Sequence, residues 1–118
     1  MGYQSTAIAY NTRQSVDSST FSGSYLPIGS PISNSARIVK IINNSGVDVD
    51  ISTDGVTNHD FIPKNGFTLY DLGTNRGNDS PCLNFSTGTQ FYAKGSASTG
   101  LVYMISLYGQ GNTQTPPL

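Results

Sequence analysis

The sequence predicts an all-β fold: a single β-sandwich, jelly-roll-like or a small barrel, with an extended N-terminal arm. The first observation is composition, because the chain has no glutamate and only three lysines and three arginines, residues that helices favour on exposed faces. The second is that β-branched and aromatic residues dominate the apolar set, as they do in strands. The third is spacing, since short apolar segments recur between turn residues and none has a helical period.

Residues 1–35 are the predicted arm, in which nine larger apolar or aromatic residues are spread through Ser, Thr, Gly and Pro. Ordering the backbone costs about 1–2 kcal/mol per residue, and each fully buried apolar side chain returns about 1.5–3 kcal/mol. Burial alone therefore does not hold the arm, which must add strands to its own sheet or to the edge of a neighbouring subunit. Both alternatives stay open, and under the second the sandwich remains folded when residues 1–30 are removed. The residues expected to contact another subunit are Tyr3, Tyr10, Phe21, Tyr25, Leu26 and Ile28.

Residues 36–110 are the predicted sandwich, and the segment ARIVKIINNSGVDVDIST is its clearest part. Ile38–Ile42 forms an apolar strand, and Asn43–Gly46 supplies residues that tolerate positive φ in a turn. In the return strand Val47, Val49 and Ile51 alternate with Asp48, Asp50 and Ser52. Such alternation is typical of a sheet with one buried and one solvated face. The segment therefore predicts a β-hairpin.

Three further features complete the predicted domain. Residues 67–72 form another strand, and residues 83–85 form a short one. Residues 90–94 and 101–108 are predicted to form a second hairpin, whose last strand is apolar on both sides and is expected to be a central strand buried on both faces. Residues 111–118 are a polar tail that ends in two prolines and a leucine, and proline cannot donate to a strand ladder.

Composition argues against several classes of function. The net charge is −1 and the six cations are scattered, so we expect no nucleic-acid partner, which would require a basic stripe. No apolar run is long enough to span a membrane, and the N-terminal residues lack the pattern of a secretory signal. Cys82 is the only cysteine, so neither an intrachain disulfide nor a cysteine-based metal site is expected.

The sequence also predicts that the protein is not an enzyme. His59 is the only histidine; it lies in a polar loop, and no nucleophile elbow accompanies it. Glycosidase chemistry needs two paired carboxylates, and no such pair is evident. Asp54, Asn58 and Asp60, with Asp71 or Asp79, are oxygen ligands suited to Ca²⁺. They lack the spacing of a calcium loop, and we expect neither a metal nor a cofactor.

Four turn motifs carry a resemblance to a known group of proteins. They are I-x-N-N-S-G from residue 41, S-x-D-G from residue 52, I-P-x-x-G from residue 62, and Y-A-K-G-S…T-G from residue 92. Over residues 36–110 the chain resembles small β-sandwich virion proteins of tailed bacteriophages.

The resemblance implies a structural role without catalytic residues, as a capsid decoration (cement) protein that stabilises the phage head. A head-tail connector or tail component is the alternative. The implied location is the virion, after synthesis in the host cytoplasm. The implied partners are the major capsid protein or neighbouring subunits, and a homodimer or homotrimer is expected.

A carbohydrate- or receptor-binding module is the competing class of function. Its ligand would contact two loops, residues 54–60 and 73–81, although the chain has no tryptophan and would have to use Tyr70, Tyr92 or Tyr108 to stack on a sugar. A glycan array would separate this class from a structural subunit. The candidate ligand-contacting residues are Asn58, His59, Asp60, Asn75, Arg76, Asn78 and Asp79.

Overall fold

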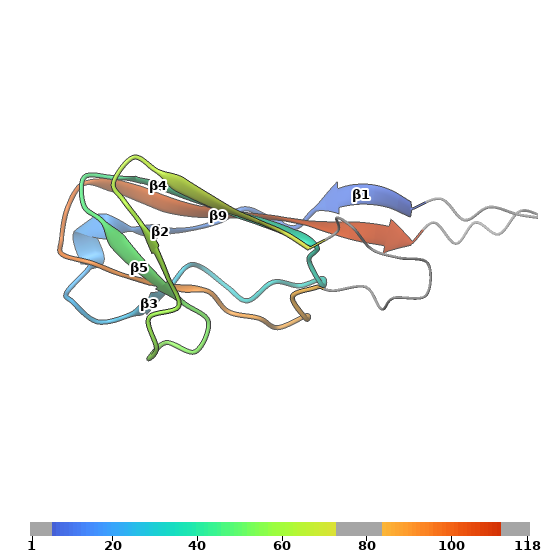
Figure 1. Ribbon diagram of the computed structural model, residues 1–118, viewed down its shortest axis with the longest axis horizontal. Coiled ribbons are helices and arrows are strands. Elements are labelled where there is room, and N and C mark those ends of the chain that lie inside the picture. The colour runs from blue at the N-terminus through green and yellow to red at the C-terminus, as the bar shows by residue number, and fades with distance from the viewer. Residues whose placement is uncertain (1–5, 73–83, 112–118) are drawn as a thin grey trace, which may run out of the picture.

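A computed structural model describes residues 6–72 and 84–111, and it confirms the predicted all-β sandwich. Two antiparallel sheets face each other, sheet A above sheet B in the view of Figure 1. The strands of sheet A are β1 (Thr6–Tyr10), β2 (Gln14–Asp17), β4 (Ile38–Ser45), β7 (Phe67–Asp71) and β9 (Gly100–Gly111). Those of sheet B are β3 (Leu26–Pro27), β5 (Val49–Ser52), β6 (Asp60–Ile62) and β8 (Tyr92–Lys94). One 3₁₀ turn, Ser18–Thr20, links β2 to the segment before β3.

The strand order is that of a jelly roll. Sheet A runs β2-β9-β4-β7 and sheet B runs β3-β8-β5-β6. The chain crosses from one sheet to the other at every step after β2 except between β5 and β6, which form a hairpin. Such alternation between two four-stranded sheets produces the interlocked Greek keys of jelly-roll domains. The jelly-roll form of the predicted sandwich is therefore the one observed.

Both predicted hairpins are wrong, because each pair of strands lies in opposite sheets. β4 pairs with β7 and β9, whereas β5 pairs with β6 and β8. Likewise β8 belongs to sheet B and β9 to sheet A. The two connections meet, since the Gly46 N–H donates to the Thr99 carbonyl at 3.1 Å. A strand that crosses the sandwich buries the same alternating face as one that folds back in a hairpin, so the pattern alone does not separate them.

A buried polar side chain organises the crossing from β4 to β5, which we call the β4–β5 arch (residues 43–48). The Asn43 amide donates to the carbonyls of Val47, Ile62 and Pro63 at 2.9, 3.1 and 3.2 Å. Its side-chain oxygen accepts from the Ser45 N–H and hydroxyl. Buried backbone carbonyls need such partners. Asn43 therefore holds the chain at the point where it leaves sheet A.

The predicted boundary between arm and sandwich at residue 35 is also wrong for the described part of the arm. β1 and β2 pair with β9, and β3 pairs with β8. Phe21, Ile28 and Ile32 are buried in the core. Residues 6–35 thus follow the first alternative, adding strands and core side chains to their own domain. Deletion of residues 1–30 would remove β1, β2 and β3 and the core side chains of Phe21 and Ile28, so we expect it to destabilise the sandwich.

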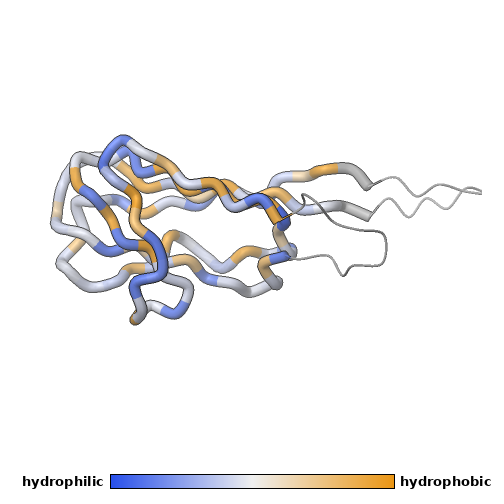
Figure 2. Tube along the Cα trace, in the orientation of Figure 1, coloured by the Kyte–Doolittle hydropathy of each residue, from blue (hydrophilic) through white to orange (hydrophobic). Residues whose placement is uncertain are grey.

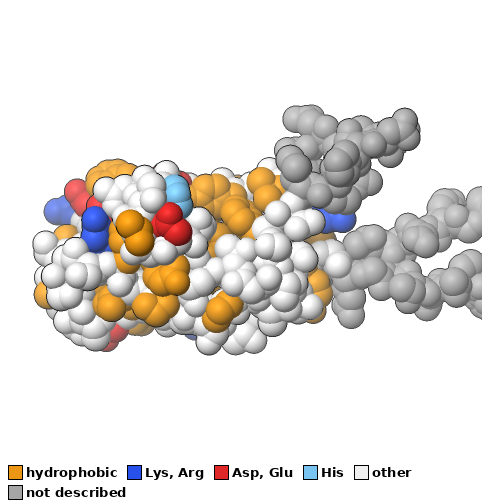
Figure 3. Space-filling view, turned by 90° about the horizontal axis from the view of Figure 1, so that it is seen from below, with side chains coloured by type: hydrophobic (Ala, Val, Ile, Leu, Met, Phe, Trp, Pro, Cys, Tyr) orange, Lys and Arg blue, Asp and Glu red, His pale blue; other side chains and the backbone are white. Residues whose placement is uncertain are grey.

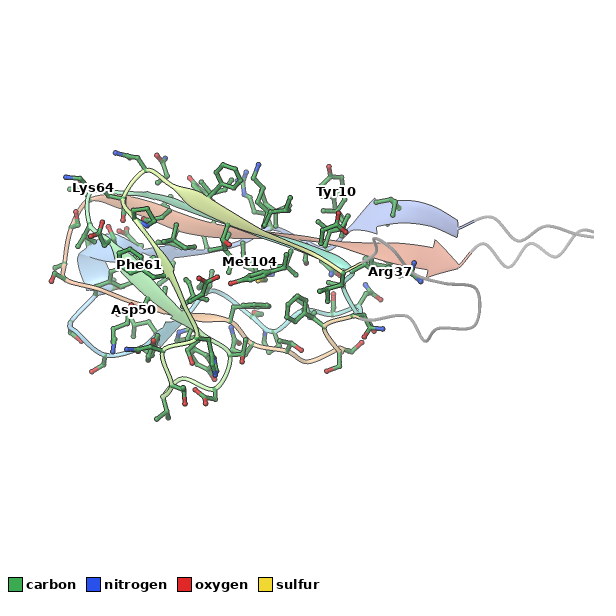
Figure 4. All side chains as sticks on the ribbon, in the orientation of Figure 1. Tyr10, Arg37, Asp50, Phe61, Lys64 and Met104 are labelled. Atoms are coloured by element: carbon green, nitrogen blue, oxygen red, sulfur yellow. The ribbon has the colours of Figure 1, made fainter. Side chains whose placement is uncertain are left out.

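β9 is the central strand, as predicted, because it pairs along both edges. Its inward side chains Val102 and Met104 are fully buried, and Figure 4 shows Met104 between the sheets. Its opposite face is only half-buried, which corrects the expectation of burial on both faces. β9 also outruns β4, whose pairing ends at Leu107, and continues beside β1 as a two-stranded ribbon that projects from the sandwich (Figure 1).

The two remaining strand predictions fare differently. The strand predicted at residues 67–72 is confirmed as β7, one residue shorter. The short strand predicted at residues 83–85 is reduced in the described part to an isolated bridge between Ala36 and Phe85.

Candidate functional site

The most unusual surface of the molecule is the side of sheet A that points away from sheet B, here called the outer face of sheet A. Strand alternation places there every second residue of each strand. In register, Ile42 lies between Tyr103 and Phe67, and Lys40 lies between Ile105 and Leu69. Figure 2 shows hydrophobic residues along β4, β9 and β1. Together with Lys40, the apolar members of the face are Ile8, Tyr10, Ile38, Ile42, Phe67, Leu69, Leu101, Tyr103, Ile105 and Leu107.

Four large side chains of this face are more than half exposed to solvent. The exposed fractions are 70% for Tyr10, 62% for Phe67, 56% for Ile8 and 53% for Leu69. Figure 4 shows Tyr10 standing on the side of sheet A away from sheet B. Scattered exposed apolar residues are normal, but a contiguous apolar patch marks an interaction site. The register makes this patch contiguous from the ribbon to β7.

Two cations lie over aromatic rings of the same face. The Lys40 ammonium is 5.1 Å from the centre of the Phe67 ring, and the Arg13 guanidinium carbon is 5.0 Å from that of Tyr103. Such contacts contribute about 0.5–1 kcal/mol at exposed sites. The aliphatic stems of Lys and Arg cover apolar surface in this arrangement, so the cations do not interrupt the face.

The outer face of sheet B is mixed in character. In register, Asp50 lies between Phe61 and Lys94, and Phe61 is 54% exposed. Figure 3, seen from the side of sheet B, shows hydrophobic side chains interspersed with charged ones and with other surface. The two sheets therefore differ, since sheet A carries a continuous apolar face and sheet B does not.

The residues predicted to contact another subunit fall into three groups. Tyr10 lies on the outer face of sheet A. Tyr25 and Leu26 are half-buried within the chain; the Tyr25 hydroxyl donates to Asn58, and the Lys94 ammonium lies 4.7 Å from its ring centre. Phe21 and Ile28 are core residues, and this corrects the expectation for them because a core side chain presents no surface to a partner. Tyr3 lies outside the described residues.

The loop that follows β5 contains the only histidine. His59 Nδ1 accepts the Thr53 N–H at 3.1 Å, and its Nε2 lies 4.0 Å from the Asp54 carboxylate. Asp54 accepts the N–H groups of Thr57 and Val56, which hold the pKa of its carboxyl well below the usual range. Each group thus serves the turn itself, and Asn58, at its exposed tip, accepts from Tyr25 and Lys94.

A pocket of about 200 Å³ opens between this loop and β7. The Tyr70 hydroxyl donates to the Asp60 carboxylate. Burial, then the hydrogen bond to Asp60 and its negative charge, raises the pKa of Tyr70 above its ordinary value, so the hydroxyl stays protonated. The rings of Tyr70 and Phe85 meet edge to face at 5.8 Å. The lining residues are Ile51, Thr53, His59, Asp60, Tyr70, Phe85 and Phe91.

The candidate ligand residues are thus partly brought together. His59 and Asp60 line one pocket with Tyr70, whereas Asn58 does not. The whole second predicted loop, residues 73–81, lies outside the described residues, and with it Asn75, Arg76, Asn78 and Asp79. Among residues 6–72 and 84–111, no group of three or more His, Cys, Asp or Glu side chains could hold a metal ion.

Within the described ranges, no helix has the length and apolar character needed to cross a membrane.

The outer face of sheet A was not predicted as a site from the sequence. Residues Leu101, Tyr103, Ile105 and Leu107 share one face of the last strand, but a strand that is apolar on both sides is expected to be buried on both. A usable signal was the alternation of Phe67 and Leu69 with polar neighbours, next to a strand with Lys40 among apolar residues. The local sequence pattern does not reveal that this face lacks a covering second layer.

No protein-family model, no curated protein and no solved structure matches the chain.

Proposed function

We propose that this protein is a non-enzymatic structural subunit that acts by docking against other protein surfaces. The observation that supports this is the outer face of sheet A. Taking about 200 Å² for a fully exposed aromatic side chain and somewhat less for Ile and Leu, its four most exposed members present about 500 Å². At about 25 cal/mol per Å² their burial contributes about 12 kcal/mol before the costs of association are subtracted.

The assembly we propose is a tailed-phage particle, in which the chain serves as a capsid decoration (cement) protein. Two considerations support this choice: the turn motifs resemble small virion proteins, and jelly rolls are common in viral capsid proteins. Both are analogies at the level of the fold, which hosts many functions. The partners would be the major capsid protein or neighbouring subunits, reached after synthesis in the host cytoplasm. A connector or tail position would use the same surface.

The test is co-sedimentation of the purified chain with phage heads, together with mass spectrometry of purified particles. We expect the chain to be found in particles, and Phe67→Ser to reduce the amount bound. The matched control is Phe61→Ser, which removes a phenylalanine of similar exposure from the outer face of sheet B. Absence of the chain from particles would refute the virion assignment, and equal binding by both variants would refute the role of this face.

A second candidate, a carbohydrate- or receptor-binding module, is favoured by the pocket beside Tyr70. Its size is below the range of about 300–1,000 Å³ typical of drug-sized ligands and suits a single sugar ring. Asp60 and His59 offer hydrogen-bonding groups beside the apolar rings of Tyr70 and Phe85, a combination that suits a hydroxylated ring with apolar C–H faces. A glycan array followed by NMR titration of wild type and Tyr70→Ala tests it, and no binding by the wild type would remove this candidate.

A further inference from the structure

We infer that the outer face of sheet A is covered by the same face of a second copy of this chain, in a two-fold symmetric dimer. This inference rests on the proposed function in one respect, namely that the face docks against protein. It goes further by assigning the occupant, which is a neighbouring subunit of the same chain and not the major capsid protein. Three properties of the face support a second copy: its shape, its area and its charge.

The face is the surface of a twisted four-stranded sheet, formed by β2, β9, β4 and β7 with β1 as an extension. Two sheets pack face to face at about 10 Å when their strands lie within about 30° of each other, because both have the same twist. A second copy supplies a sheet of matching twist and length. A two-fold interface uses one patch twice, and it is the commonest arrangement of soluble oligomers.

The exposed area matches what a stable dimer needs. To the four most exposed side chains, the half-buried members Ile38, Ile42, Leu101, Tyr103, Ile105 and Leu107 add roughly 200–300 Å², at a modest fraction of the area of each side chain. The face then offers about 750 Å², near the value of about 800 Å² per partner in a standard interface. It exceeds the patch of about 300–600 Å² that is the largest on a typical monomer.

The charges on the face are balanced. Lys40 and Arg13 are its cations. The strand register places two carboxylates at its opposite margins, Asp17 opposite Leu101 on β2 and Asp71 opposite Ile38 on β7. Two copies therefore meet without net repulsion, and each brings both signs of charge. A strongly acidic or strongly basic partner would find no excess of the opposite charge on this face.

Sedimentation velocity on the full-length chain over a range of concentrations tests the inference. We expect a dimer for the wild type, and at least a tenfold higher dissociation constant for Phe67→Ser and for Leu69→Ser, since central aromatic and aliphatic anchors dominate interfaces. Phe61→Ser on sheet B is the matched control and should leave the dimer intact. Far-UV circular dichroism and thermal unfolding establish that each variant is folded.

Three results would overturn the inference. A wild type that stays monomeric at all concentrations would rule out a second copy as the occupant of this face. Equal weakening by Phe61→Ser and Phe67→Ser places the contact elsewhere. A trimer would also contradict the inference, because a three-fold interface joins two different patches and not one patch to itself. The proposed function is tested separately. If the wild type is monomeric but Phe67→Ser reduces particle binding, the face docks against particle protein without forming a dimer. If the wild type is dimeric but absent from particles, the dimer stands and the virion role is refuted.

Discussion

Replacing Asn43 by alanine should be among the most destabilising single changes in this fold. The side chain is fully buried, and its amide donates to three backbone carbonyls, those of Val47, Ile62 and Pro63. These carbonyls belong to the β4–β5 arch and to the end of β6. Among the described residues no buried side-chain polar atom lacks a partner, so the change would create a defect where none exists.

The magnitude follows from what is left unpaired. A buried polar group without a partner costs about 1–3 kcal/mol. The two amide hydrogens are shared among three carbonyls, so about two full hydrogen bonds are lost, and the Ser45 hydroxyl loses its acceptor as well. We expect the free energy of unfolding to fall by about 3–4 kcal/mol, a large part of the roughly 5–15 kcal/mol that stabilises a domain.

The assay is equilibrium urea unfolding followed by circular dichroism, with Asn44→Ala as the matched control. Asn44 is the exposed neighbour in the same strand, and its replacement should change the free energy of unfolding by less than about 0.5 kcal/mol. Asn43→Asp preserves the shape but turns the donor toward the carbonyls into an acceptor, and should be at least as destabilising as alanine at neutral pH. A loss below about 1 kcal/mol for Asn43→Ala would refute the account of the arch.

Three further predictions concern the fold. Gly100 has φ +98°, and a Cβ added there would lie 2.2 Å from the Asn44 backbone oxygen. Gly100→Ala should therefore lower the free energy of unfolding by more than about 2 kcal/mol, against about 1 kcal/mol for Gly23→Ala, where nothing lies within 4 Å of the added Cβ. Ile28→Ala should cost about 2–5 kcal/mol because it empties a core site, whereas Ile8→Ala on the exposed ribbon should cost little; equal effects in urea unfolding would contradict the placement of residues 6–35. The folded-state pKa of Asp54 is lowered, so its ionised form stabilises the fold above the unfolded value of about 3.9. The stability difference between wild type and Asp54→Ala should therefore be constant near neutral pH and shrink as the pH falls below about 4; a difference independent of pH would count against it.

The fold class and the inward faces of the strands could be predicted from the sequence. Val49 and Ile51 were predicted on one face from a period of two, and both are buried. Composition, through the absence of glutamate and the abundance of β-branched residues, excluded a helical fold. These features are local, because strand propensity and alternation depend on the residue and its neighbours along the chain.

The pairing of the strands could not be predicted from the sequence, because it depends on contacts between distant parts of the chain. The segment around Asn43 has the residues of a hairpin turn, yet the chain crosses to the opposite sheet there because the Asn43 side chain bonds carbonyls of β6 and its flanks. Those carbonyls lie some twenty residues away, so their presence is invisible in the local pattern. Contacts with distant residues also explain Phe21 and Ile28. Their isolated positions in a polar segment predicted an extended arm, but both side chains pack in the core of the sandwich.

The candidate site, too, could be predicted from the sequence only in part. Apolar residues on both sides of β9 were visible in the sequence, but their environment depends on whether a second layer covers sheet A. The described chain places its helical turn and sheet B elsewhere, and leaves Phe67 and Leu69 exposed. The alternation of residues along a strand shows which of them share a face. Whether that face contacts the core, solvent or another subunit depends on the packing of the whole chain.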